Sequence, residues 1–313
     1  MTKILMILTS HRLDCFKLTM DLLVATDSLV QFDKVVLMLN GVVGRHLAYV
    51  QQLMASHSEV SWDIISGPRG KGPRVANLQN ECVKRYPDSL YFKMDEDLFV
   101  PPGWVDKLLA AYEEHKDDPQ RALITPVVAN NATGFHYLLT AFPELKREYE
   151  TLFSHPLTPE VNGPVWGYPQ VAEWITRKFL DLRSANVQLE AHAKTTSTHE
   201  FFDWRFSINC LVYDYRHWEE MGGIPDDEEP AWGQWVSEHG KHNILATNTM
   251  LHHYSFFVQQ DWLDRSSLLE DLRLVNIPDS LPAKSLTRYH LPRWTRMAKQ
   301  VPGILKRRLG GTA

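Results

Sequence analysis

The stretch Tyr91–Asp97, YFKMDED, decides how the rest of this 313-residue sequence is interpreted. An apolar run typical of a buried strand, Leu90–Met94, leads into two carboxylates spaced one residue apart. In this i, i+2 arrangement Asp95 and Asp97 can reach toward the same side of the chain. Mg²⁺ and Mn²⁺ take oxygen ligands and keep waters or substrate phosphates as further ligands. A solvated acidic turn is the alternative, but the preceding strand and the following Pro101–Trp104 favour a functional site.

Apolar runs alternate with helical patterns along most of the chain. The expected strands are Ile4–Leu8, Val35–Leu39, Val60–Ile65, Leu90–Met94, Leu123–Val128, Arg205–Tyr213 and Ile244–Leu251. The expected helices are Phe16–Val24 (capped by Asp14), Val75–Arg85, Trp104–His115 and Ala231–Glu238. Near-continuous Val/Ile/Leu strands are buried on both faces. The pattern therefore predicts an α/β, Rossmann-like, mostly parallel twisted sheet with helices on both faces.

Polar residues gather where the expected strands end. Open parallel sheets bind ligands beyond the carboxyl ends of their strands. That edge carries Thr9–Arg12, Asn40-Gly41, Gly67–Arg74 and Asp95–Asp97. We expect Arg12, Lys71 and Arg74 to be able to contact phosphate oxygens. Thr9 and Asn40 lie at strand ends on the same edge.

Leu90–Trp104 resembles the Asp-x-Asp strand and proline–tryptophan turn of glycosyltransferases with the GT-A fold, especially the family 2 class. Lys71–Asn77 resembles the loop and helix start where that family has a glycine and an Arg-Asn pair. Here Arg74 and Asn77 are separated by two residues, which departs from the family pattern.

The resemblance continues near the end of the chain and covers roughly residues 3–128 and 205–256. Trp218–Ile224 resembles the family's aromatic and Gly-Gly-Phe segment, and Gly240 lies where its helix-ending glycine is expected. Glu228-Glu229 falls at the family's Glu-Asp pair, and His252-His253 at its metal-ligating histidine.

The resemblance implies a hexosyltransferase-type enzyme whose donor is a nucleoside diphosphate sugar, with a UDP-sugar favoured. Mn²⁺ or Mg²⁺ would neutralise the departing diphosphate. It implies Asp97 as a direct ligand, and Asp95 as a ligand or a contact to ribose and metal-bound water. Glu96 joins the donor-binding residues, with Thr9 and Asn40 where the nucleoside base and ribose would lie. His252 or His253 completes the metal site.

A general base must accept the proton of the acceptor hydroxyl. By resemblance Glu229 takes this position in an inverting reaction, although the family more often has Asp there. Glu228 and Asp227 are the nearby alternatives. Asp226–Glu229 could instead be a solvated acidic loop at the start of the Ala231–Glu238 helix, where acids are favoured.

Composition limits the possible partners and compartment. A net charge of −5 argues against a nucleic-acid binder. Three widely spaced cysteines and the lack of a signal segment or an 18-residue apolar run favour a cytoplasmic protein. We expect a GT-A domain over residues 1–283, with an inserted acceptor-side region at about 130–200. Residues 284–313, with eight Lys/Arg and no acid, form a basic tail suited to an anionic membrane surface.

The acceptor is then expected to be a glycan or a lipid-linked molecule of polysaccharide biosynthesis, used at the inner face of the membrane. Two other functions stay open. A sugar nucleotidyltransferase would need a Gly-rich phosphate loop after the first strand, and Thr9–Arg12 is not one. A non-catalytic carbohydrate-binding or scaffold protein on a degenerate transferase fold would fit Glu229 and the Arg74–Asn77 spacing. Retention of both Asp95 and Asp97 argues against it.

Overall fold

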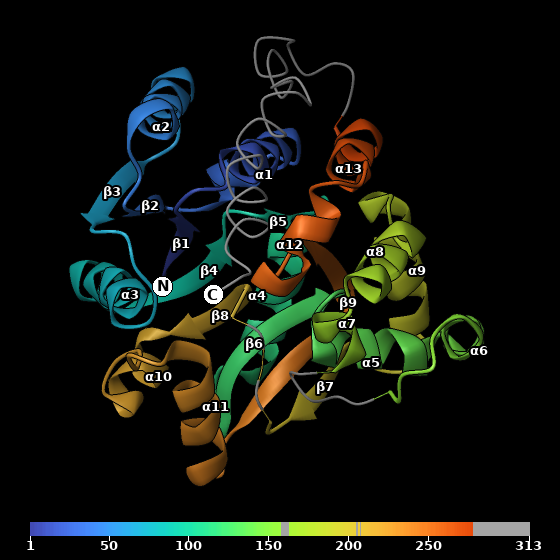
Figure 1. The fold of residues 1–313 in the computed structure, drawn as a ribbon. Coiled ribbons are helices and arrows are strands. Elements are labelled where there is room, and N and C mark those ends of the chain that lie inside the picture. The colour runs from blue at the N-terminus through green and yellow to red at the C-terminus, as the bar shows by residue number, and fades with distance from the viewer. Residues whose placement is uncertain (158–162, 205, 207, 278–313) are drawn as a thin grey trace, which may run out of the picture. The chain divides into compact units, whose positions relative to one another are not determined.

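Among the residues that the structure describes, a nine-stranded mixed sheet forms the centre. The computed structural model describes residues 1–157, 163–204, 206 and 208–277. The strands run in the order β3-β2-β1-β4-β8-β6-β9-β5, with β7 also paired to β9. Strands β3, β2, β1 and β4 are parallel, as are β6 and β9, while β8 is antiparallel to its neighbours β4 and β6. Figure 1 shows the twisted sheet with helices packed on both sides.

The elements alternate through the first half of the chain and become mostly helical in the middle. The strands are β1 Thr2–Thr9, β2 Lys34–Asn40, β3 Trp62–Gly67, β4 Ser89–Asp95, β5 Leu98–Phe99, β6 Arg121–Val128, β7 His199–Phe202, β8 Cys210–Asp214 and β9 His242–His253. The helices are α1 Leu13–Ala25, the 3-10 helix η1 Leu29–Gln31, α2 Gly44–Ser56, α3 Pro73–Arg85, α4 Trp104–His115, α5 Ala132–Ala141, α6 Pro143–Leu152, α7 Pro164–Gly167, α8 Pro169–Lys178, α9 Leu182–Ala193, α10 Tyr215–Met221, α11 Glu228–Glu238, α12 Phe257–Leu263 and α13 Leu268–Asn276.

Both faces of the sheet are covered, as two successive residues of β4 show. Tyr91 packs on Tyr213 of β8, whose ring contacts Trp232 of α11. Phe92 points to the opposite face and contacts Trp104 of α4. All five aromatic side chains are fully buried. This explains why β4 is apolar at consecutive positions rather than at alternate ones.

The expected α/β sheet is confirmed, with shifts at some boundaries. The helix expected at Trp104–His115 is α4 to the residue. The expected cap of α1 is wrong: α1 begins at Leu13, so Asp14 lies in its first turn and accepts a hydrogen bond from the Cys15 amide. The strand expected from residue 205 begins only at Cys210.

The three cysteines, Cys15, Cys82 and Cys210, are buried and free. Within the part of the chain that the structure describes, no helix combines the length and apolar character needed to span a bilayer. The basic tail expected at 284–313 lies outside the described residues.

The parallel strands place their carboxyl ends side by side. Thr9 is paired with Leu39, and Leu8 with Asp95, so β1 ends between β2 and β4. The last residue of β2, Asn40, is paired with Gly67 at the end of β3. The polar segments that follow these strands therefore meet at one edge of the sheet, as expected.

Candidate active site

The short strand β5 fixes the geometry after the acidic stretch. Only two residues separate β4 from β5, which pairs antiparallel with the end of β9, so that Leu98 lies opposite His253. The amide of Tyr254 donates to the Asp97 carbonyl at 2.9 Å. This pairing brings His253 Nε2 to 3.3 Å from Asp97 Oδ1, with both side chains buried.

Asp97 is held in its charged form in this position. Burial alone would raise its pKa, but the charge and hydrogen bond of His253, together with Arg12, bring the pKa below its ordinary value. His253 Nδ1 is buried and has no hydrogen-bond partner among the described residues. An ionised carboxylate beside an imidazole nitrogen fits the donor set of a divalent cation.

The other histidine of the pair points elsewhere. Neighbouring residues of a strand project to opposite sides. His252 Nε2 donates to the carbonyl of Phe179 at 2.7 Å, and burial lowers the pKa of His252 to about 4. The structure thus places His253, and not His252, beside Asp97.

Asp95 is anchored by a buried lysine. Lys93 Nζ donates to Asp95 Oδ1 at 2.6 Å and to the Ile208 carbonyl at 2.5 Å. Asn209 Nδ2 donates to the other carboxylate oxygen at 3.2 Å. Within the described chain, Asp95, Asp97 and His253 do not all converge to within 4.8 Å of one another. Joint binding of one ion would therefore need Asp95 to turn from Lys93, or a bridging water.

Glu96, between the two aspartates, turns back toward the loop after β1. Its Oε2 accepts from Thr9 Oγ1 at 2.7 Å and from the Ser10 amide at 3.0 Å. Its Oε1 accepts from the amides of His11 and Arg12 at 3.1 and 3.2 Å. Burial raises the pKa of Glu96, and these hydrogen bonds oppose that effect. Glu96 therefore shapes the Ser10–Arg12 loop.

Thr9 and Asn40 both use their side chains to hold loops. Thr9 Oγ1 lies 3.0 Å from His46 Nε2 as well as bonding Glu96. Asn40 makes a reciprocal pair with the backbone of Gly70, with both distances 2.8 Å. Gly41 allows this close approach, since a Cβ there would lie 2.3 Å from the Arg69 Cβ. The loop after β3 is thereby fixed against the end of β2.

Arg12 is buried and engaged by the end of the domain. Its Nη1 donates to Ser255 Oγ at 3.0 Å, and its Nη2 to Asp264 Oδ1 at 2.9 Å. Its guanidinium lies 5.2 Å from the ring centre of Tyr254. These contacts use the donors that we expected to be offered to phosphate.

The three other basic or amide residues expected at this edge lie on the loop after β3 and the start of α3. Lys71 is exposed, with Nζ 5.4 Å from the ring centre of Phe257 in α12. Arg74 folds back to donate to the Arg69 carbonyl at 2.5 Å. Asn77 is exposed on α3. Of the three, Lys71 extends toward the C-terminal elements.

The two glutamates at the start of α11 lie near the acidic stretch and bond to different partners. Glu228 Oε1 accepts from Gln79 Nε2 of α3 at 2.6 Å. Burial raises the pKa of Glu228 to about 7, with Asp95 and Glu229 adding to the rise and Lys93 opposing it. Glu229 Oε2 accepts from the Ile208 amide at 3.4 Å. Because Ile208 also binds Lys93, the pair and Asp95 share one polar cluster.

Sequence reasoning missed several members of this cluster. Lys93 had a readable signal, because a lysine inside an apolar strand needs a buried partner, and an acid follows two residues later. Gln79 and Asn209 had none, since nothing in the sequence pairs residue 79 with 228 or residue 209 with 95.

The fold was compared with known proteins. No protein-family model matches the chain, and no curated protein matches its sequence. Among solved structures it is similar to the mannosyltransferase PcManGT from Pyrobaculum calidifontis in complex with GDP-Man and Mn²⁺, with a TM-score of 0.50 and 13% identity over 97% of this chain and 80% of that one. It is also similar to GalNAc-T7 with UDP, GalNAc and Mn²⁺ (TM-score 0.48, 9% identity, 82% of this chain and 44% of that one). A third is S. aureus TarS 1-349 in complex with UDP-GlcNAc (TM-score 0.31, 15% identity, 41% of this chain and 34% of that one).

At this level of identity the mannosyltransferase match shows the fold. The chain has the GT-A type of α/β fold that the resemblance implied.

Proposed function

We propose that this protein is a glycosyltransferase that moves a sugar from a nucleoside diphosphate sugar to a hydroxyl of a glycan or lipid-linked acceptor. The observation that carries the proposal is the buried Asp97–His253 pair, 3.3 Å apart at the end of β4. Sheets of this kind bind ligands beyond the carboxyl ends of their strands, which is where this pair lies. The GT-A type fold supports the same function.

A divalent cation, Mn²⁺ or Mg²⁺, would be held by Asp97 and His253, with Asp95 as a further ligand or a water-mediated one. When bound, such an ion stabilises the negative charge that develops on a departing diphosphate. Asp97 stays ionised beside His253, and Lys93 and Asn209 hold Asp95 in an orientation from which it would reach the ion through a water.

Lys71 is our candidate for a direct contact to the donor phosphates, because its ammonium is exposed on the loop held by Asn40. Arg12 serves a positioning role instead. It ties the Ser10–Arg12 loop to Ser255 and Asp264. Thr9 and Glu96 set the conformation of the same loop, on which the nucleoside would rest.

Glu228 is the better candidate for the general base. A base works best when its pKa lies near the working pH, and burial brings the pKa of Glu228 to about 7. The acceptor hydroxyl would give its proton to Glu228 while its oxygen bonds to the anomeric carbon and the diphosphate leaves. This direct displacement inverts the anomeric centre. Glu229, next to it and bonded to the Ile208 amide, would hold the start of α11 in place.

The test is a thermal-shift panel of UDP- and GDP-sugars with and without Mn²⁺. We expect one donor class to stabilise the protein only when the metal is present. Stabilisation follows RT ln(1 + [L]/Kd), or about 2.7 kcal/mol at a hundredfold excess over Kd. Asp97→Ala should lose the metal-dependent shift.

The adjacent histidines give a matched control. His253→Ala should weaken the shift, whereas His252→Gln should keep it, because His252 is bonded to Phe179 and not to Asp97. A full shift in Asp97→Ala would overturn the metal assignment. Slow metal-dependent release of nucleoside diphosphate from the stabilising donor would separate a transferase from a carbohydrate-binding scaffold.

A further inference from the structure

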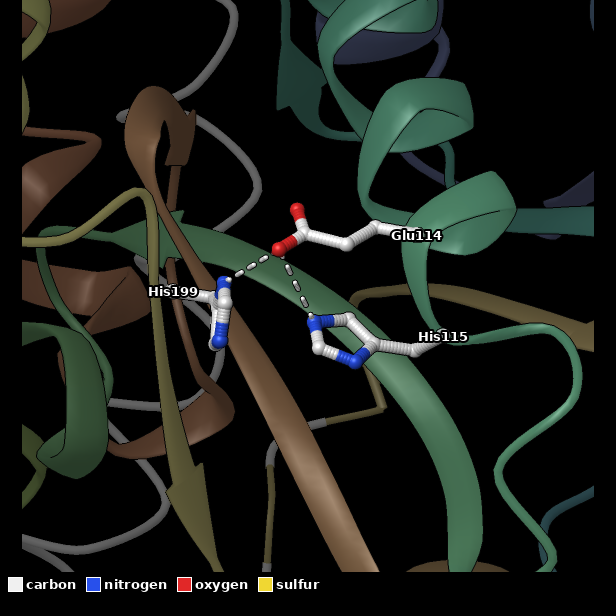
Figure 2. A group of neighbouring side chains, drawn as sticks. All are labelled: Glu114, His115 and His199. Carbon is white, nitrogen blue, oxygen red and sulfur yellow. Dashed lines mark ion pairs between the residues drawn. The ribbon is translucent and has the colours of Figure 1, made fainter.

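A group of metal-ligand side chains lies away from the site described above. Glu114 and His115 end α4, and His199 begins β7. Glu114 Oε1 is 4.0 Å from His115 Nε2 and 3.8 Å from His199 Nδ1. Figure 2 shows the carboxylate directed at both imidazole rings. Over the described ranges of the chain, this is the one group of three His, Cys, Asp or Glu side chains whose ligand atoms all lie within 4.8 Å of one another.

The group has a different place in the sheet from Asp97 and His253. His199 is paired with Ala246 in the amino-terminal half of β9, whereas His253 is the last residue of that strand. The two sites are therefore separate, and β9 runs from one toward the other.

The surroundings of the group suit a bound cation. His115 Nε2 is buried and makes no hydrogen bond within the described chain. The rings of His115 and His199 pack edge to face at 4.3 Å between centroids, and Phe201 contacts both. The carboxyl end of a helix carries partial negative charge, which favours a cation at the end of α4.

The donor set selects the kind of ion. Two imidazoles and one carboxylate match Zn²⁺, which takes nitrogen and oxygen ligands at about 2.0–2.2 Å. Ligand atoms around one tetrahedral ion are then about 3.3 Å apart. The three ligand atoms lie within 4.8 Å of one another, so each pair needs to approach by less than about 1.5 Å. Mn²⁺ and Mg²⁺ prefer oxygen-rich sites such as the aspartate pair.

We propose that Glu114, His115 and His199 form a second metal site that binds Zn²⁺ and joins the end of α4 to β7. Water fills the fourth position. The ion stabilises the fold without entering the sugar-transfer reaction, and its binding does not depend on the proposed function.

The test uses the full chain, freed of any histidine tag, in an Asp97→Ala background that removes the first site. Zn²⁺ is titrated against a chromophoric chelator. We expect one Zn²⁺ per chain and a rise in Tm on binding. His199→Gln and His115→Ala should each weaken binding at least about 10-fold, the lower end of the cost of losing even an outer partner of a metal site.

Matched controls come from the same helix and from another surface histidine. Glu113→Gln, next to the group but paired with Lys116, and His239→Ala, on a different element, should leave binding unchanged. Glu114→Gln tests the site without touching the core, because Glu114 is exposed. Unchanged affinity in both Glu114→Gln and His199→Gln would overturn the proposal, and so would Mn²⁺ binding as tight as that of Zn²⁺.

Discussion

Glu96 shows how a residue between two proposed ligands can act on a different part of the site. It lies in the turn between β4 and β5, and its carboxylate points away from Asp95 and accepts four hydrogen bonds from residues 9–12. Its carbonyl accepts another from Thr19 Oγ1 at 2.7 Å. The acidic stretch therefore both carries the proposed metal ligands and holds the neighbouring loop.

Glu96→Gln should damage that loop. The new NH₂ group can donate to the Thr9 hydroxyl, but it faces the Ser10 amide, a donor, so that contact is lost. Leaving a buried group unsatisfied costs about 1–3 kcal/mol, and we expect a loss of this size in the free energy of unfolding. Urea denaturation measures it. A Ser10→Ala variant, which keeps the backbone contact, is the control, and equal stability of Glu96→Gln and the parent would contradict the assignment.

The raised pKa of Glu228 predicts how the free energy of unfolding depends on pH. Its pKa is raised from 4.5 to about 7, so the folded state binds its proton more tightly than the unfolded state. This stabilisation is complete below pH 4.5 and is lost as pH rises through 7, by up to about 3 kcal/mol. Glu228→Gln should remove that loss, so the variant should gain stability relative to the parent between pH 5 and pH 8.

Glu228 should also determine how kcat/KM depends on pH. If Glu228 is the base, kcat/KM of the parent rises with pH up to about 7 as the carboxylate loses its proton, and Glu228→Gln removes that limb with most of the activity. Glu229→Gln is the matched comparison. A limb that survives in Glu228→Gln and disappears in Glu229→Gln would return the role to Glu229.

The residue types of the site were easier to predict than the directions in which their side chains point. Asp97 lies beside His253 because β5 pairs with β9. The sequence shows both segments, but it does not show that they pair, because they are about 150 residues apart. Arg12, Thr9 and Asn40 are at the expected edge, yet their polar atoms turn inward to Asp264, Glu96 and Gly70. Spacing gives the edge on which a residue lies, but only packing decides what its side chain contacts.

At the scale of elements, a helix or strand was predicted correctly where the spacing of its apolar residues agreed with the residues that mark its ends. Trp104–His115 follows a Pro-Pro-Gly turn and has a clear apolar face, and α4 matches it. Helix α2 was not predicted, because only three of its residues, His46, Val50 and Leu53, are buried and its apolar pattern is short. The aromatic-rich stretch from residue 130 forms helices α5 to α9, which pack on one another and, through α5 and α9, on strands β6 and β9.

Strands β6 and β8 are joined by a buried ion pair that can be tested. Arg121 Nη2, at the start of β6, lies 2.5 Å from Asp214 Oδ2 at the end of β8, and Tyr112 donates to the same oxygen at 3.1 Å. Asp214→Asn keeps the side-chain cap of α10 but leaves Arg121 with an unpaired buried charge. Breaking a buried pair costs about 3–5 kcal/mol, measured as loss of unfolding free energy in guanidinium.

An exposed pair supplies the comparison. Lys116 and Glu113 lie 2.9 Å apart with both side chains about half exposed. Glu113→Gln should therefore change stability by no more than about 1 kcal/mol. Similar losses in the two variants would mean that burial of Arg121 does not set the cost.

At the scale of the whole described domain, contacts between distant parts of the chain complete the site. Arg12, in the loop after β1, binds Ser255 and Asp264, more than 240 residues later. Gly72 lies close to the loop before α11, because a Cβ on it would be 3.0 Å from the Asp226 carbonyl. The proposed donor loops are therefore held by segments that follow β8 and β9, and the site exists only once both ends of the domain have folded together.

The contact of Arg12 with the final helices gives a prediction at this scale. Arg12→Met keeps the volume and the packing on Tyr254 but loses the hydrogen bonds to Ser255 and Asp264. Strands β1, β2 and β3 are held by their own ladders, so the loss should be local to α12 and α13. A cost of about 1–3 kcal/mol corresponds to about 5- to 150-fold faster amide exchange in residues 257–276, measured by hydrogen–deuterium exchange. Exchange that stays unchanged there, or that rises equally in β1, would show that Arg12 does not hold the end of the domain.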